Sequence, residues 1–181
     1  MSIKMTSVSE LSHELSTPRN IRVLMVCTGN ICRSPMAESI LRGSVAATPL
    51  AGRLTVDSAG THAYHVGEPA DRRARAALDE AGYGWEHRAR VIRPEWLAER
   101  DLVLAMDVGH QRHLQALAAR AGLPADGVRM LREFDPGGAG DVPDPYYDTI
   151  AEFRDVRVML ERCMPTLLDE LRVIADGLAS D

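Results

Sequence analysis

Eight consecutive residues near the start of the chain combine a potential nucleophile with groups that bind oxyanions. Cys27 is followed by five residues and then by Arg33 and Ser34, in the segment C-T-G-N-I-C-R-S. A thiolate is a strong nucleophile, and a guanidinium matches two oxygens of a phosphate group. A serine hydroxyl can donate a hydrogen bond to sulfur. These residue types predict attack of Cys27 on a phosphorylated substrate.

The flanking residues place this segment between a strand and a helix. Residues 21–26 form a short apolar run typical of a buried strand. Residues 36–43 have helical character, with Ser34 as the expected N-cap and Pro35 as the first helical residue. A helix N-terminus presents unpaired N–H groups and a partial positive charge, which attract anions and favour a thiolate.

The residues between Cys27 and Arg33 are expected to cradle phosphate or another oxyanion. Gly29 and Asn30 tolerate unusual backbone angles, so the loop can direct several amides inward. The residues assigned to substrate binding here are Thr28, Gly29, Asn30, Ile31, Cys32 and Ser34. The chain has no G-x-x-x-x-G-K-[ST] segment, so this is not an ATP-type phosphate loop.

Further apolar runs alternate with helical patterns along the chain. Strands are expected at residues 54–59, 102–106 and 128–131, and helices at residues 71–81, 107–121 and 149–174. Pro165 interrupts the last pattern and can kink that helix. The alternation predicts a single α/β domain over residues 21–178, with a parallel sheet that carries helices on both faces. Ligands bind at the carboxyl ends of such strands, where the Cys27 loop lies.

Composition limits the partners and the compartment. The 181 residues carry a net charge of −5, which disfavours nucleic acid because phosphate backbones bind basic faces. No apolar run reaches the roughly 18 residues of a membrane span. Residues 1–20 are predicted to be a flexible tail and lack the apolar core of a secretory signal. Three cysteines are too few for a secreted disulfide framework, so we expect a cytoplasmic location.

Four segments resemble the low-molecular-weight protein tyrosine phosphatases. They are V-L-M-V-C-T-G-N-I-C-R-S-P-M-A-E at residues 23–38, V-D-S-A-G-T at 56–61, L-A-M-D at 104–107 and D-P-Y-Y at 144–147. The resemblance covers residues 21–174. It implies a four-stranded parallel sheet, no cofactor, and hydrolysis of phosphotyrosine in proteins through a cysteinyl-phosphate intermediate.

The resemblance also identifies a general acid in the D-P-Y-Y segment. By residue type alone, any of the 26 acidic residues could protonate a leaving oxygen. The family match selects Asp144, whose backbone is restricted by Pro143 and Pro145. Asp141 and Asp148 are the alternatives. Relatives often have glycine at the position of Asp148, which leaves the substrate preference open.

The resemblance assigns three further groups around the loop. A buried polar network that supports the cradle would comprise Asn30, Ser34, Ser58 and His87. Aromatic walls for a phosphorylated phenyl ring would be Tyr64, Tyr146 and Tyr147. Cys32 would form a reversible disulfide with Cys27 and so protect it from overoxidation. By contrast, Arg72, Arg73 and Arg75 are expected to form a solvated helix face, and Cys163 a core thiol.

Other functions share parts of this pattern. Arsenate reductases have the same fold and loop but need more redox cysteines, and none lies between Cys32 and Cys163. Arginine phosphatases resemble this loop with threonine in place of Ile31, so the bulkier isoleucine favours tyrosine. An inactive phospho-binding module would be expected to lose the nucleophile, the arginine or the acid. No metal site is expected, because His110 and His113 lack further ligands.

Overall fold

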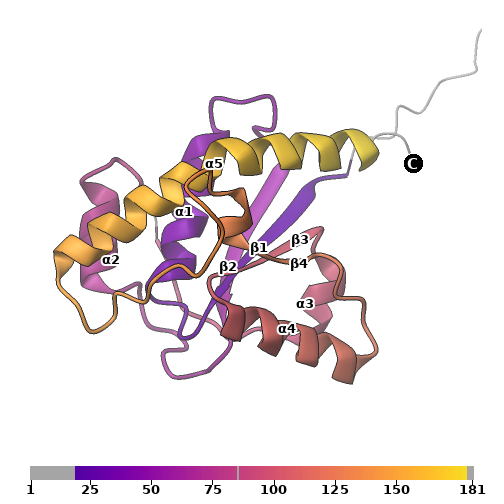
Figure 1. Cartoon of the computed structure of the whole chain (residues 1–181), viewed down its shortest axis with the longest axis horizontal. Coiled ribbons are helices and arrows are strands. Elements are labelled where there is room, and N and C mark those ends of the chain that lie inside the picture. The colour runs from indigo at the N-terminus through magenta and orange to yellow at the C-terminus, as the bar shows by residue number, and fades with distance from the viewer. Residues whose placement is uncertain (1–18, 85, 179–181) are drawn as a thin grey trace, which may run out of the picture.

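A four-stranded parallel sheet forms the centre of the molecule (Figure 1). The structure is a computed structural model that describes residues 19–84 and 86–178. The strands are Ile21–Cys27 (β1), Leu54–Gly60 (β2), Leu102–Ala105 (β3) and Val128–Met130 (β4), in the spatial order β2-β1-β3-β4. In this register Cys27 lies opposite Gly60 at the carboxyl end of the sheet. The predicted α/β fold with four parallel strands is confirmed.

Helices cover both faces of the sheet (Figure 1). One face carries Arg33–Val45 (α1), Arg72–Asp79 (α2) and Ile150–Leu178 (α5), and the other carries Pro94–Glu99 (α3) and Val108–Ala121 (α4). Successive side chains of a strand point to opposite faces. Accordingly Val23 and Met25 pack in the α1 and α5 core, whereas Leu24 and Val26 pack in the α3 and α4 core. The part of β1 that is buried on both faces, from Val23 to Cys27, must therefore be apolar, whereas Arg22 is exposed.

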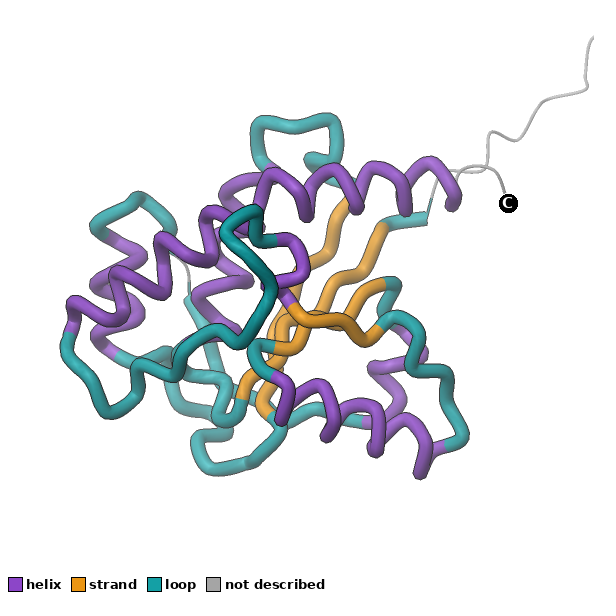
Figure 2. Tube along the Cα trace, in the orientation of Figure 1, coloured by secondary structure: helices purple, strands orange, loops and turns teal. Residues whose placement is uncertain are grey.

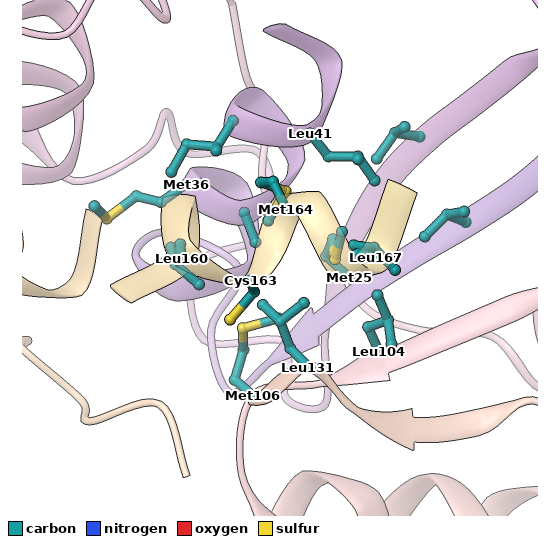
Figure 3. Packing of buried hydrophobic residues seen from close by; sticks show 14 of the residues in the cluster. Met25, Met36, Leu41, Leu104, Met106, Leu131, Leu160, Cys163, Met164 and Leu167 are labelled. Atoms are coloured by element: carbon teal, nitrogen blue, oxygen red, sulfur yellow. The ribbon is translucent and has the colours of Figure 1, made fainter. Parts of the chain in front are cut away.

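The larger core lies between α1, α5 and the sheet, as Figure 3 shows. Met25 and Leu104 rise from the sheet toward Leu41 of α1 and Leu167 of α5, and all four side chains are fully buried. Burying one such side chain stabilises the fold by about 1.5–3 kcal/mol. This packing fixes α1 on β1, and with it the loop that joins them.

The helix ends show where local sequence signals hold and where they fail. Asp107 caps α4 by accepting from the N–H of His110 at 2.8 Å, and Gly122 ends that helix with φ 66°. The predicted start of α1, with Ser34 as N-cap, is wrong. The helix begins at Arg33, and its N-cap residue is Cys32. Ser34 does not cap α1, because its hydroxyl is hydrogen-bonded elsewhere.

Other boundaries also differ from the sequence predictions. Helix α5 continues through Pro165 to residue 178, and its axis bends near the middle (Figure 1). The helix α3 and the 3-10 turn Leu131–Phe134 (η1) were not predicted, because six and four residues are too short for a periodic pattern. Most of the predicted tail, residues 1–18, lies outside the described residues. Arg19 is described, and it pairs with Asp101 at 2.7 Å.

Two loops lie at the carboxyl ends of the strands. Figure 2 shows loops gathered at this end of the sheet. The cysteine loop (residues 27–33) joins β1 to α1, and the DPYY loop (residues 135–149) joins η1 to α5. No helix within residues 19–84 and 86–178 is long and apolar enough to cross a membrane.

A buried carboxylate anchors the start of the DPYY loop. The Asp135 side chain is fully buried and accepts from Arg162 at 2.6 and 2.7 Å, from Arg132 at 3.1 Å and from the N–H of Gly137 at 2.8 Å. The hydrogen bonds from Arg162 are the main reason that the pKa of Asp135 lies well below its usual range. Arg132 also donates to the carbonyl of Asp141 at 2.9 Å.

Asp135→Asn is expected to lower the free energy of unfolding by about 2–4 kcal/mol at neutral pH. The folded pKa is depressed, so this contribution is complete above the unfolded pKa of about 3.9 and is lost as pH falls through the folded pKa. Urea unfolding should therefore give a constant difference between wild type and variant down to about pH 5. Below about pH 4 the difference should shrink by up to about 1.4 kcal/mol per pH unit.

The matched control is Asp169→Asn, which removes an exposed carboxylate that pairs with Arg172. Exposed pairs contribute about 0–1 kcal/mol, so this variant should unfold almost like wild type. An Asp135→Asn difference that stays unchanged down to pH 3 would contradict the assignment.

Candidate active site

The carbonyl groups of the cysteine loop are hydrogen-bonded to elements outside it. Backbone N–H groups of Thr61, His62 and Asp71 donate to the carbonyls of Cys27, Thr28 and Ile31 at 2.9, 3.0 and 2.8 Å. None of the hydrogen bonds between described residues uses the backbone N–H groups of residues 29–33. Outward carbonyls and unpaired amides at a helix N-terminus form an anion-binding nest. The loop therefore has the backbone geometry of an oxyanion cradle.

A chain of hydrogen bonds leads from a buried carboxylate to the sulfur of Cys27. Ser58 Oγ donates to Glu38 Oε2 at 2.7 Å and accepts from Asn30 Nδ2 at 2.8 Å. Asn30 Nδ2 also donates to Ser34 Oγ at 3.0 Å. Ser34 Oγ therefore keeps its own hydrogen for an acceptor, and the nearest one is Cys27 Sγ at 2.9 Å. This direction of donation stabilises a thiolate.

Asn30 is the residue that shapes the loop. It has φ 58°, the left-handed region that asparagine tolerates better than most residues. Its Oδ1 accepts from the N–H of Arg90 at 2.9 Å, and its carbonyl accepts from His87 Nε2 at 2.7 Å. Gly29, in contrast, does not have a positive φ, so the expectation that it supplies an unusual backbone angle is wrong. A Cβ at Gly29 would lie 2.8 Å from the His65 ring, so glycine is needed for close packing.

Arg33 lies between the cysteine loop and two carboxylates from distant segments. Its side chain is only 4% exposed, so its charge depends on these partners. Nη1 donates to Asp107 at 2.9 Å and to the carbonyl of Val142 at 3.1 Å, and Nη2 donates to Asp144 at 2.7 Å. Asp107 and Val142 therefore fix the orientation of the guanidinium through Nη1. Asp144, whose side chain is 48% exposed, contacts it through Nη2.

The carboxylate of Asp107 is kept ionised by its neighbours. Burial raises the pKa of Asp107, but contacts from His110 and the charge of Arg33 outweigh burial and hold that pKa well below its usual range. His110 lies 3.0 Å from Asp107 through Nδ1 and 2.8 Å from Thr28 Oγ1 through Nε2. This cluster joins α4 to the cysteine loop.

The cysteine loop and the DPYY loop line one cavity of about 190 Å³. That is smaller than the roughly 300–1,000 Å³ of sites for drug-sized ligands, so it suits a single side chain. The predicted residues that line it are Cys27, Thr28, Gly29, Ile31, Cys32, Arg33, Tyr64, Asp144, Tyr146 and Tyr147. The other predicted site residues do not line it. Asn30, Ser34 and Ser58 are buried, and His87 is partly buried and bonds to the carbonyl of Asn30.

The aromatic side chains stand at the mouth of the cavity. Tyr64 is 71% exposed and Tyr147 is 94% exposed, while Tyr146 is partly buried. The rings of Tyr146 and Tyr147 meet edge to face at 4.9 Å. The tyrosines lie two and three residues after Asp144, so a ring bound between them and the cysteine loop would lie beside this carboxylate.

The alternative acids lie outside the cavity lining. Asp141 Oδ1 accepts from the N–H of Val108 at 2.9 Å, at the start of α4. Asp148 contributes its backbone carbonyl to Arg73 at 2.6 Å. Of the three candidate acids, Asp144 alone lines the cavity.

The two other cysteines differ from Cys27 in their surroundings. Burial, with the nearby charge of Asp71, raises the pKa of the Cys32 thiol, so it stays protonated at neutral pH. Burial raises the pKa of Cys163 to about 11, and its thiol donates to the carbonyl of Met159 at 3.3 Å. Within the described ranges, no group of three or more His, Cys, Asp or Glu side chains is arranged to hold a metal ion.

The pattern of the family described as "Low molecular weight phosphotyrosine protein phosphatase" matches residues 22–175. The chain belongs to this family. The phosphatase is 45% identical over 162 residues to a low molecular weight protein-tyrosine-phosphatase of Streptomyces coelicolor, covering 88% of this chain and 98% of the relative. It is an enzyme of the protein-tyrosine-phosphatase class, a phosphoric monoester hydrolase.

Solved structures agree with this assignment. A protein tyrosine phosphatase from Entamoeba histolytica, with Hepes in its active site, has a TM-score of 0.79 and 30% identity, covering 84% of this chain and 97% of that chain. An arginine phosphatase from Geobacillus stearothermophilus has a TM-score of 0.72 and 33% identity, covering 84% and 94%. The fold is thus shared by phosphatases that act on different amino acids.

Sequence reasoning missed several residues of the phosphatase site. His65 lines the cavity next to Tyr64, and its position directly after that residue was the available signal. Asp107 lies in the L-A-M-D segment and Glu38 ends the segment 23–38, but neither was predicted to belong to the site. Asp107 contacts Arg33, and Glu38 accepts from Ser58. Arg73 was expected to be solvated, which is wrong because its side chain is bonded to the DPYY loop. The sequence carries no signal for that pairing.

Proposed function

We propose that the phosphatase hydrolyses phosphotyrosine in proteins by two successive phosphoryl transfers. In the first, the Cys27 thiolate forms an S–P bond while the bond from phosphorus to the tyrosine oxygen breaks. The carboxyl group of Asp144 gives its proton to that oxygen. General acid catalysis of this kind contributes about 10²–10⁴-fold. The observation that supports this is the 2.7 Å contact between Arg33 and Asp144, which joins the acid to the cradle.

In the second transfer, water replaces the sulfur. The carboxylate of Asp144 takes a proton from water, the hydroxide oxygen bonds to phosphorus, and the S–P bond breaks to return the thiolate and inorganic phosphate. Arg33 and the loop amides stabilise the charge on the equatorial oxygens in both steps. Ser34 donates to the sulfur when it leaves, as its 2.9 Å contact allows.

Substrate binding prepares Asp144 for its acid role. A bound phosphate dianion competes with the Asp144 carboxylate for Arg33 Nη2. Its negative charge also favours the protonated form of a neighbouring carboxyl group. The ion pair of the ligand-free protein is therefore exchanged for a phosphate–arginine pair and a protonated acid.

The cavity wall favours an aromatic substrate. Ile31 is 7% exposed and places an apolar side chain in the cavity lining, and Tyr64 and Tyr146 supply ring surface. Aromatic pairs add about 0.5–1.5 kcal/mol beyond burial. The arginine phosphatase likeness keeps phosphoarginine as the second candidate. We assign this activity to a domain of residues 21–178 in a reducing, cytoplasmic compartment, without a cofactor.

The test is hydrolysis by the wild-type chain of three peptides that differ only in one residue: phosphotyrosine, phosphoserine or phosphoarginine. Phosphotyrosine is expected to have the highest kcat/KM, and acid quench during turnover should trap phosphate on Cys27. A higher kcat/KM for phosphoarginine would replace tyrosine by arginine as the substrate. Equal rates for all three, or no trapped phosphate, would reject the proposal.

We further propose that Cys32 protects Cys27 during oxidation. Peroxide would convert the Cys27 thiolate to sulfenic acid, and the Cys32 sulfur would displace water from it to form a disulfide. Because the pKa of Cys32 is raised, this closure is expected to be slow at neutral pH and faster at higher pH. Cys32→Ser should recover less activity than wild type when thiols are added after peroxide. Equal recovery in both proteins would exclude this role.

A further inference from the structure

We propose that Arg73, together with Asp71, is a positioning residue that fixes the DPYY loop relative to the cysteine loop and so holds Asp144 at the substrate. This inference rests on the proposed role of Asp144 as the general acid. It concerns a side chain on α2 that does not line the cavity.

The guanidinium of Arg73 is bonded to the DPYY loop at two points. Nη1 donates to the carbonyl of Asp148 at 2.6 Å, and Nη2 donates to the carbonyl of Tyr146 at 2.9 Å. Its carbon lies 4.7 Å above the ring of Phe153, a buried residue of α5. Two bonds from one planar group restrict both the position and the direction of the backbone that follows Asp144.

Asp71 connects this arginine to the cysteine loop. The backbone N–H of Asp71 donates to the carbonyl of Ile31 at 2.8 Å. Its carboxylate accepts from Arg73 Nε at 3.0 Å and Nη2 at 2.8 Å, and from the N–H of Arg73 at 2.7 Å as the N-cap of α2. Ile31 is therefore linked through Asp71 and Arg73 to the carbonyls of Tyr146 and Asp148. We call Asp71 and Arg73 the strap.

The strap complements the contact between Arg33 and Asp144. That ion pair must be exchanged when phosphate binds, whereas the Arg73 side chain donates only to Asp71 and to two backbone carbonyls, so substrate does not displace it. After the exchange, two links between the loops remain: Arg33 Nη1 still donates to the carbonyl of Val142, before Asp144, and the strap still holds the carbonyls of Tyr146 and Asp148, after Asp144. The role of the strap is therefore greatest when Asp144 must deliver its proton.

The neighbouring arginines of α2 provide a matched comparison. Arg72 and Arg75 are exposed, and their side chains make no hydrogen bond or ion pair with any described residue. The expectation of a solvated face is therefore correct for these two residues. A change at either position alters the charge of α2 as a change at Arg73 does, without touching the DPYY loop.

The first test compares Arg73→Met with wild type on two aryl phosphates. Phenyl phosphate has a poor leaving group and depends on the acid, whereas p-nitrophenyl phosphate depends on it little. We expect kcat/KM to fall about tenfold for phenyl phosphate and less than about threefold for p-nitrophenyl phosphate, a fraction of the full effect of a general acid. Arg73→Lys, which keeps the charge but has one donating nitrogen in place of three, should restore part of the loss, and Arg72→Met and Arg75→Met should match wild type.

The second test does not depend on activity. Hydrogen exchange of the N–H groups of Tyr146 and Asp148, which are bonded within the DPYY loop, should be faster in Arg73→Met and unchanged in Arg72→Met. Equal losses of kcat/KM with both aryl phosphates, or unchanged exchange, would overturn the proposal. A wild type that hydrolyses neither compound would reject the proposed function. The exchange rates would still test whether the strap fixes the DPYY loop. If Arg73→Met does not fold, the aryl phosphate kinetics and the hydrogen exchange are measured on Arg73→Lys instead.

Discussion

Cys27→Ser is expected to abolish hydrolysis of every phosphate ester, with kcat/KM lower by about 10⁴-fold or more, the scale on which removal of a covalent nucleophile acts. The physical reason is that the mechanism needs an anion at this position, and a serine hydroxyl stays neutral where a thiol ionises. The measurement is steady-state hydrolysis of p-nitrophenyl phosphate. Acid quench of the variant should trap no phosphate on the chain.

The same variant should still bind inorganic phosphate. The groups that hold the anion are the loop amides and Arg33, and a serine at position 27 leaves them in place. Isothermal titration should therefore give phosphate affinity close to that of wild type, which separates a lost nucleophile from a collapsed loop. The control is Cys163→Ser, a buried thiol far along the chain whose hydrogen bond to Met159 a hydroxyl can keep. Turnover that survives in Cys27→Ser would end the proposal.

The sheet could be predicted because its signals are local. Strand β1 is buried on both faces from Val23 to Cys27, so this stretch is apolar, and the glycine at position 122 ends α4 in the left-handed conformation it prefers. The cradle could be predicted for the same reason. Cys27 ends β1, and Arg33, close behind it in the sequence, is the first residue of α1.

Ser34 shows why a local rule can fail at such a site. Serine before proline at the start of a helix is a strong capping signal. Here the hydroxyl accepts from Asn30 and faces the sulfur of Cys27, so it does not cap α1. A Ser34 cap would accept from the N–H of Met36 or Ala37, and the N–H of Met36 already donates to the carbonyl of Cys32 at 3.1 Å. The rule fails because α1 begins at Arg33, before the serine, and the serine hydroxyl faces the sulfur.

The long-range contacts of the site could not be predicted, for a different reason. Arg33 contacts residues 107 and 144, and Arg73 contacts residues 146 and 148, at sequence separations of 73 to 111. Nothing in the composition of α2 distinguishes Arg73 from Arg72, and only the rotation of the helix decides which one faces the DPYY loop. Such pairings depend on tertiary packing, which a single sequence does not encode in any local pattern.

Asp144→Asn is expected to reduce kcat/KM for phenyl phosphate by about 10²–10⁴-fold, because the amide has no proton to give to the leaving oxygen. The amide oxygen can still accept from Arg33 Nη2, so the DPYY loop should keep its position. With p-nitrophenyl phosphate the loss should be much smaller in the first step, since that leaving group needs little protonation. A series of aryl phosphates should therefore show a steeper dependence on leaving-group pKa in the variant than in wild type.

The second step provides an independent check on the same residue. Without a base at position 144, hydrolysis of the cysteinyl phosphate slows, and rapid-mixing kinetics with p-nitrophenyl phosphate should show a burst of one p-nitrophenol per chain. Asp141→Asn and Asp148→Asn are the controls, because neither carboxylate lines the cavity. If Asp141→Asn or Asp148→Asn reproduces the steeper leaving-group dependence and Asp144→Asn does not, the acid has been assigned to the wrong residue, although the thiolate and its cradle would stand.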